Sequence, residues 1–472
     1  MRWSFLVLMV FASTTAIAQE SLLHADFRRE GERIAGSCNG LNFTAVLACG
    51  DELFTDTPLH IASGSMPPQN GFSLGGAFVA YKNTKNWRLS WDVDAVASEN
   101  GSWRAGAYMK MIHTPPVVIK PVIPSDESGA APPKKKPKLA VHPYTVFNLY
   151  AQSISLNKLD FYGLGNDSSL AGESLFGMTQ TIVGANVIKP VFEWPAISRL
   201  NLALLGEVNG RFVNVRGDYG HSFPSIQTLY TNTTAPGLSS QPGFAQLGQG
   251  FRVKPVILKD HFQVNYLGNF QEFFAPSSSE NSFLRWTADL NHTFYLYGYT
   301  QSAPQATDNN GPDQCAQAGE TCPPISRSRN LSGSIGLRLL VSESINSASS
   351  AVPFYFQPTL GGSDINSALF LGSFRDYRFR APNLLLLEGS FEHSIWGPVG
   401  FSFVADQGRV ALIRGDLGFD HLKRSFAIGL TLRAGGFPMV YVMFAWGGGE
   451  GNHTIFNMNS SLLGGSSRPA LD

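Results

Sequence analysis

Apolar and polar residues alternate along much of the chain. The segment Leu89–Ala97 has one apolar face, while the other face carries Asp92 and Asp94. The segments Leu284–Leu290 and Phe426–Leu432 repeat the pattern. A period of two is typical of a β-strand with one apolar and one polar face. The sequence therefore predicts an all-β chain built from antiparallel strands.

About 16 segments have this character, which is within the range of transmembrane β-barrels. They begin at Phe72–Tyr81, include Pro353–Thr359 and end at His453–Asn459. In this count Arg216–Gln241 is a periplasmic connection, with a small helix expected around Ser225–Tyr230. Its length is unusual, because periplasmic turns of such barrels are normally short. A soluble β-sandwich would show the same alternation, so the pattern alone leaves both folds open.

Composition and the start of the chain favour the barrel. Charged residues make up 15% of the sequence, against roughly 25% in soluble domains. Arg2, the apolar run Trp3–Ala12 and the small residues Ala16–Ala18 form a secretory signal pattern, with cleavage before Gln19. No later apolar run approaches the ~20 residues that a membrane-spanning helix needs. We therefore predict a bacterial outer-membrane protein.

Four regions follow from this prediction. They are a signal peptide (1–18), a short periplasmic segment (19–70), an outer-membrane β-barrel (71–460) and a C-terminal tail (461–472).

The net charge and the cysteines bear on possible partners, disulfides and cofactors. The formal net charge is zero, so no nucleic-acid partner is indicated. The four cysteines fit an oxidising compartment, and we predict local disulfides, Cys38 with Cys49 and Cys315 with Cys322. A zinc site would need tighter ligand spacing and nearby histidines. The sequence contains no phosphate loop, dinucleotide fingerprint or clustered metal ligands, so we expect neither a cofactor nor a metal.

Three motifs are more specific. Gly361-Gly362 is followed after a short gap by Phe370–Arg380, and a later strand contains Phe403–Gly408. Upstream, Asp160–Asp167 contains an aromatic-Gly-x-Gly turn. Together these motifs resemble the bacterial surface antigen family, the barrel domain shared by BamA, TamA and two-partner secretion transporters. The resemblance implies a barrel whose long sixth extracellular loop folds back into the lumen.

The resemblance also assigns roles to residues. Gly361 and Gly362 match the Gly-Gly turn, Phe374 matches the aromatic position of the loop motif, and Asp406 matches the carboxylate of the following strand. In the family, an arginine of the loop motif reaches that carboxylate and forms a charge-assisted pair inside the barrel.

The sequence departs from the family pattern at this pair. Gly372 stands where the arginine is expected, and Ser373 stands where the motif has glycine. Asp406 therefore either lacks its usual partner or pairs with Arg375 or Arg378. Alternatively, these two arginines are simply solvated in the loop or lumen. The segment up to about Gln69 is also too short for a POTRA module, so we expect a barrel without POTRA domains.

Three functions compete. The first is insertion or transport of polypeptides, with outer-membrane lipid, unfolded outer-membrane polypeptides or a periplasmic protein as partners. The second is a passive channel plugged by the sixth loop. The third is an esterase using Ser73, because Gly71–Gly75 matches the nucleophile-elbow pattern. That pattern requires a helix after the serine, whereas the sequence here predicts a strand, so we expect no enzyme and no catalytic residue.

Overall fold

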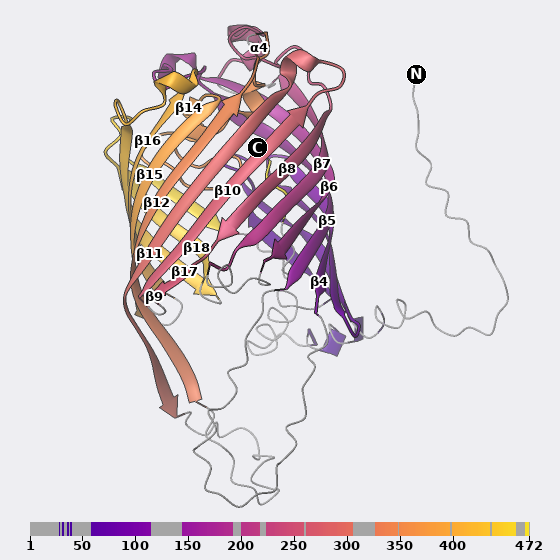
Figure 1. The fold of residues 1–472 in the computed structure, drawn as a ribbon, viewed down its shortest axis with the longest axis vertical. Coiled ribbons are helices and arrows are strands. Elements are labelled where there is room, and N and C mark those ends of the chain that lie inside the picture. Colours follow the sequence, from indigo (N-terminus) through magenta and orange to yellow (C-terminus); the bar gives the residue numbers. More distant parts are fainter. Residues whose placement is uncertain are drawn as a thin grey trace, which may run out of the picture.

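The body of the protein is a β-barrel (Figure 1). The computed structural model describes residues 58–114, 144–191, 200–217, 223–258, 261–304, 326–347, 349–396, 399–434, 437–458 and 468–471, with some isolated positions between 28 and 39. The wall consists of β1 (Leu59–Ser65), β2 (Phe72–Asn83), β3 (Trp87–Ser98), β4 (Trp103–His113), β5 (Thr145–Phe161), β6 (Ser174–Pro190), β7 (Ala203–Gly217), β8 (Phe244–Val253), β9 (Val256–Leu258), β10 (Phe262–Phe274), β11 (Phe283–Pro304), β12 (Ser326–Ile345), β15 (Asn383–Trp396), β16 (Val399–Ala411), β17 (Lys423–Ala434), β18 (Phe437–Trp446) and β19 (His453–Met458).

Every wall strand pairs antiparallel with its neighbour in chain order, so the wall is an up-and-down meander. β8 and β9 share one position, because both pair with β10. Within the described residues the wall therefore has sixteen strand positions, which confirms the predicted fold class.

The sequence missed one wall strand and assigned another segment wrongly to the wall. β1 was not predicted, because its small and polar residues alternate weakly, and it extends the wall into the region expected to be a periplasmic segment. Pro353–Thr359 is not a wall strand. It contains a 3-10 turn at Phe354–Phe356, and its aromatic side chains are buried inside the barrel. The alternation there reflects packing of a loop rather than of a strand.

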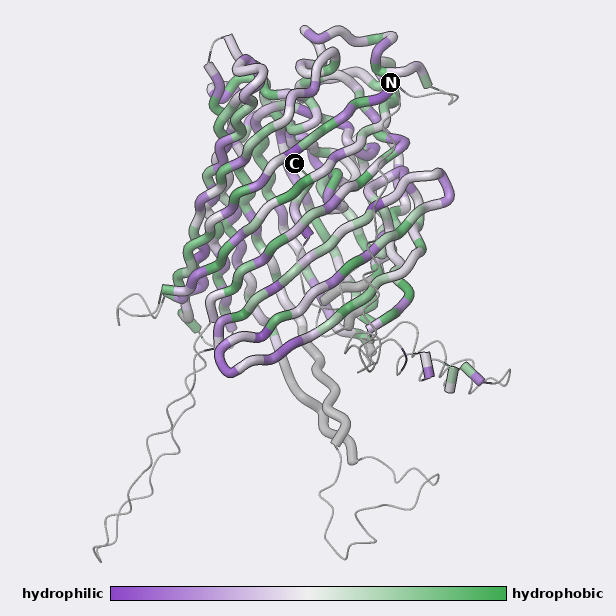
Figure 2. Tube along the Cα trace, turned by 90° about the vertical axis from the view of Figure 1, so that its right-hand side faces the viewer, coloured by the Kyte–Doolittle hydropathy of each residue, from purple (hydrophilic) through white to green (hydrophobic). Residues whose placement is uncertain are grey.

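The alternation along true wall strands places apolar side chains outward. On β3, Trp91 is 37% exposed and Val93 is 51% exposed, whereas Asp92 and Asp94 are buried in the lumen. Figure 2 shows hydrophobic and hydrophilic residues alternating along the strands. An apolar outer face with a polar interior is the pattern of a barrel surrounded by lipid. Among the described residues, no helix is long and apolar enough to cross a membrane.

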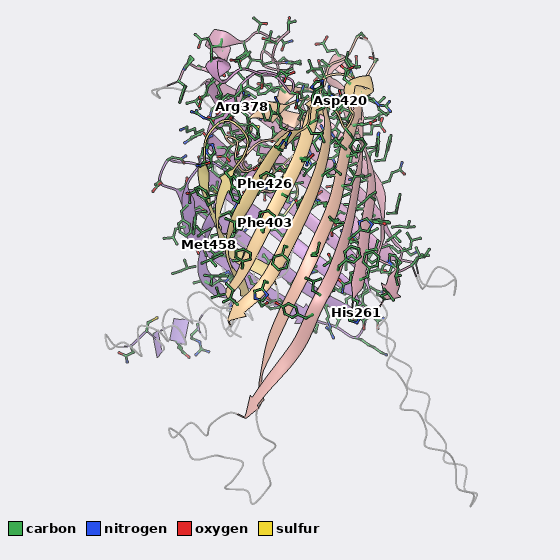
Figure 3. The ribbon with its side chains drawn as sticks, turned by 90° about the vertical axis from the view of Figure 1, so that its left-hand side faces the viewer. His261, Arg378, Phe403, Asp420, Phe426 and Met458 are labelled. Atoms are coloured by element: carbon green, nitrogen blue, oxygen red, sulfur yellow. The ribbon has the colours of Figure 1, made fainter. Side chains whose placement is uncertain are left out.

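The extra strand β1 also corrects the place of Arg216–Gln241. Counting from β1, this segment joins the seventh and eighth wall strands, so it lies at the same end of the barrel as the connection between β12 and β15. It contains α4 (Ile226–Leu229), which confirms the small helix, and α4 lies at that end in Figure 1. Figure 3 places Arg378 and Asp420 near this end and His261 near the other.

Candidate functional site

The connection between β12 and β15, called loop six below (residues 346–382), enters the barrel. Its predicted Gly-Gly turn follows a two-residue strand, β13 (Thr359–Leu360), which pairs with β14 (Phe379–Arg380). Gly361 and Gly362 have φ values of 101° and 60°, and their N–H groups donate to Phe370 O (3.1 Å) and Leu371 O (3.2 Å). A side chain at either position would collide with the loop itself, so both the backbone conformation and the close approach require glycine.

Asp406 holds loop six through a backbone group. Its Oδ2 accepts the N–H of Leu371 at 3.0 Å, and the neighbouring Ser373 N–H donates to Ser425 Oγ at 2.9 Å. Asp406 is 3% exposed and Leu371 is fully buried. Asp406, the carboxylate expected from the resemblance, therefore contacts the loop motif. Its donor is the backbone N–H of Leu371 and not the arginine side chain that the resemblance implies. Gly372 fits this arrangement, because a Cβ added there would lie 2.9 Å from Ile455 Cδ1 of β19 and 3.3 Å from Ala445 Cβ of β18, which leaves little room for a larger side chain.

The two arginines suggested as substitutes pair with other residues. Arg375 forms an ion pair with Glu173 (2.6 Å) near the start of β6. Arg378 forms a buried ion pair with Glu450 (2.6 Å) and also donates to the hydroxyl and carbonyl oxygens of Ser168, both at 2.7 Å. Neither arginine takes Asp406 as its partner in the structure.

The Arg378 guanidinium is also enclosed by aromatic rings. It lies 5.1 Å from the ring centre of Tyr162 and 4.7 Å from that of Phe379. Phe374, the predicted aromatic position, packs edge-on against Phe379 at 5.0 Å. Arg378 is therefore the main ionic anchor of loop six, a role that the sequence did not predict because Glu450 and Ser168 are distant in the chain.

The aromatic-Gly-x-Gly turn contacts loop six directly. Gly163 and Gly165 have φ values of 90° and 98°, and Gly165 N–H donates to Arg380 O at 2.7 Å. The Arg380 guanidinium donates to Phe354 O at 2.8 Å. The resemblance had linked these two regions only through family motifs, and the structure joins them by a hydrogen bond.

The first and last wall strands meet at a seam, defined here as the junction of β1 and β19. Met458 N–H donates to Ser65 Oγ at 3.0 Å across it. No backbone register pair joins these strands among the described residues. The sequence correctly placed the last strand, but it named Phe72–Tyr81 as the first one.

A cavity of about 580 Å³ lies beside the seam. Its lining comes from the end of β1, from β19 and from loop six, and includes Asp160, Glu173 and Asp376. Burial raises the pKa of Asp376 to about 6, although the Ser363 N–H donates to its carboxylate at 2.8 Å and opposes the shift. The seam, the loop and a group of acidic side chains therefore border one space.

The remaining sequence candidates are separate from this site. Ser73 lies within β2, so the residue is followed by a strand, as predicted from the sequence. Its hydroxyl donates to Gly64 O at 2.9 Å. Cys49, Cys315 and Cys322 lie outside the described residues, and both disulfide pairings stay predictions. Among the described residues, no group of three or more His, Cys, Asp or Glu side chains could hold a metal ion.

No family model and no curated protein matches the chain. The chain is similar to CdiB from Acinetobacter baumannii (10% identity, TM-score 0.44), covering 85% of this chain and 56% of that one. It is also similar to BamA from Haemophilus ducreyi lacking POTRA domains 1-3 (10%, 0.44, covering 85% and 69%) and to CdiB from Escherichia coli (11%, 0.45, covering 86% and 60%).

The chain thus spans between 56% and 69% of these structures. Its own architecture defines the class: sixteen antiparallel wall strands, an apolar outer face and a sixth loop folded into the lumen. This architecture, with an apolar outer face and a polar interior, is that of a transmembrane β-barrel.

Proposed function

We propose that this barrel assists the insertion or transport of polypeptides, and that a substrate strand pairs with the chain at the seam. The observation that carries the proposal is the seam itself, where the first and last wall strands meet and the Met458 N–H donates to Ser65 Oγ. The edge of a sheet can accept an added strand through main-chain hydrogen bonds. A seam that opens would offer two such edges to a polypeptide in the membrane.

The cavity beside the seam supports the same proposal. Its walls include Ser65 and Met66 on one side, His453–Asn457 on the other, and Arg375 and Asp376 of loop six. A strand arriving at the seam would therefore meet the loop that fills the lumen. The proposed partners are outer-membrane lipid around the wall and unfolded outer-membrane polypeptides at the seam, delivered by a periplasmic protein.

A disulfide across the seam tests the proposal. The pair Ser65→Cys and Met458→Cys places two thiols where the strands touch. The matched control is Ala80→Cys with Trp91→Cys, a register pair in the continuous β2–β3 ladder. Each variant replaces the native protein in cells, and the amounts of other outer-membrane proteins are measured. The seam lock should lower them and reductant should restore them, while the control should have no effect. Normal amounts with a fully oxidised seam would overturn the proposal.

A plugged channel is the second candidate, and burial of loop six favours it. Leu371 and Phe379 are buried within the barrel although they belong to a loop. Deleting Gly361–Ala381 should strongly raise the open-pore current in planar bilayers if the loop is only a plug. The double variant Gly361→Val/Gly362→Val displaces the loop without shortening the chain. Unchanged current in both variants would eliminate the channel.

A further inference from the structure

A short segment beyond the last strand lies against the inner face of the wall. Arg468 donates to Asp94 Oδ2 at 2.8 Å, and Leu471 N–H donates to Asn366 Oδ1 of loop six at 2.9 Å. Asp94 is on the luminal face of β3, so Arg468–Leu471, called the tail segment below, is inside the barrel. It is bound at both ends, to the wall by a charge and to loop six by a backbone group.

The charged end of the tail segment, Arg468, binds a carboxylate that is already buried in the wall. Asp94 is 1% exposed and already pairs with Arg104 of β4 at 3.2 Å. Arg468 adds a second guanidinium to the same carboxylate oxygen. Charge-assisted hydrogen bonds of this kind are stronger in a partly dry interior than at a surface. The wall therefore presents a buried carboxylate to a cation that arrives through the lumen.

The apolar end meets a hydrophobic cluster. Leu471 is 6% exposed and belongs to the cluster that contains Met66, Val96 and Tyr108. Ile365 of loop six packs against the same cluster. Leu471 thus fills a position between the wall beside the seam and the tip of loop six. Between the two ends, Pro469 has a fixed φ of about −65° and disfavours the helical region for Arg468, which suits an extended segment.

We propose that Asp94, the hydrophobic cluster and Asn366 form a luminal peptide-binding site, and that the tail segment is its resident occupant. The site recognises an arginine followed at the third position by an apolar residue, in an extended segment. This part of the inference rests on the proposed function: a polypeptide that carries this pattern and enters the lumen displaces the tail segment and frees the tip of loop six.

Cross-linking tests the occupant in the intact protein. The variant Asn366→Cys/Leu471→Cys should form a disulfide between these positions, identified by mass spectrometry of the cleaved chain. The control Asp420→Cys/Leu471→Cys keeps one thiol and moves the other to an exposed loop, and it should form none. Failure of the first pair to link, or equal linking of both pairs, overturns the placement of the tail segment.

Peptide binding tests the site itself. A fluorescent peptide with the sequence of residues 466–472 should bind the Arg468→Glu protein several-fold more tightly than the native protein, whose site is filled. A peptide with glutamate in place of arginine should not bind. Arg414→Glu serves as the control, because Arg414 pairs with Glu343 away from the tail segment, and it should behave as native. Binding to neither protein, or equal binding of both peptides, overturns the site. Both assays use purified protein, so their failure leaves the seam proposal untouched, and failure of the seam lock leaves the site untouched.

Discussion

Loop six and the seam both bring distant parts of the chain together, but they differ in how firmly they do so. Loop six is held by a buried ion pair at Arg378, by backbone N–H groups that donate to Asp406 and Ser425, and by a bridge from Gly165. Across the seam, the Met458 N–H donates to Ser65 Oγ at 3.0 Å. Loop six is therefore fixed to the wall by several buried polar contacts, and the seam is the line at which the proposed function requires the wall to open.

The tail segment links loop six to the wall. It contacts loop six at Asn366 and the wall at Asp94 of β3, which β2 separates from the seam strand β1. A polypeptide entering at the seam would first disturb this segment and only afterwards the anchors of loop six. The expected effects of mutations can therefore be ranked by how deeply each residue lies in the firm region.

The largest effect is expected at Arg378. Arg378→Ala leaves Glu450 buried without its ion-pair partner and leaves Ser168 O without its donors, and breaking a buried pair costs about 3–5 kcal/mol. Arg375→Ala is the matched control, because the Arg375 side chain is 44% exposed and such pairs contribute about 1 kcal/mol or less. Urea unfolding in detergent micelles measures both. Equal losses from the two variants would contradict the ranking.

A smaller loss is expected at the Gly-Gly turn. Gly361→Val introduces a side chain at a φ of 101° and against Arg378 Cβ, so we expect a loss of about 2–3 kcal/mol from backbone strain and overpacking. Gly389→Ala in β15 is the control, because an added Cβ there reaches no atom closer than 3.9 Å. The same unfolding assay applies. A loss at Gly389 as large as that at Gly361 would show that the turn is not special.

Stability should also depend on pH through Asp376. Its pKa is raised from 3.8 to about 6, so the folded protein keeps a proton that the unfolded chain has already released. Between these two values the folded state binds more protons, so stability falls as pH rises through the window, by about 3 kcal/mol in total. Asp376→Asn removes the titrating group and should flatten this part of the profile. A profile that keeps its slope in the variant would assign the effect to another group.

Two variants of Asp406 test whether its negative charge is needed, or only its hydrogen bond with the Leu371 N–H. Asp406→Asn keeps an oxygen that can accept the Leu371 N–H, so the loss should be small. Asp406→Leu leaves that buried N–H without an acceptor, which costs about 1–3 kcal/mol. Unfolding midpoints of the two variants give the comparison. An asparagine variant as unstable as the leucine variant would mean that the negative charge itself is required.

The sequence predicted what depends on local pattern. Alternation found the long wall strands and their lipid-facing sides, because strands such as β3 carry strong apolar and polar faces. It missed β1, because the small residues of this strand give little difference in hydropathy between its two faces. It mistook Pro353–Thr359 for a strand, because aromatic residues packed in the lumen resemble the composition of a strand. The motifs found the Gly-Gly turn and Asp406. They could not find Glu450, Ser168 or the tail segment, because those contacts arise only when the barrel closes.

The smallest effect is expected at the seam. Ser65→Ala removes the acceptor of the Met458 N–H, and a hydrogen bond at the end of a short edge strand contributes about 1 kcal/mol or less. Ser73→Ala is the control within the same region, because its hydroxyl donates to Gly64 O inside the continuous β1–β2 ladder and is buried. If the seam is weak, Ser73→Ala should destabilise the barrel at least as much as Ser65→Ala in the unfolding assay. Hydrogen exchange then sharpens the comparison, because faster exchange in Ser65→Ala should be confined to β1 and β19. Loss of protection around the whole wall would mean that Ser65 closes a firm barrel, and the contrast between seam and loop six would be lost.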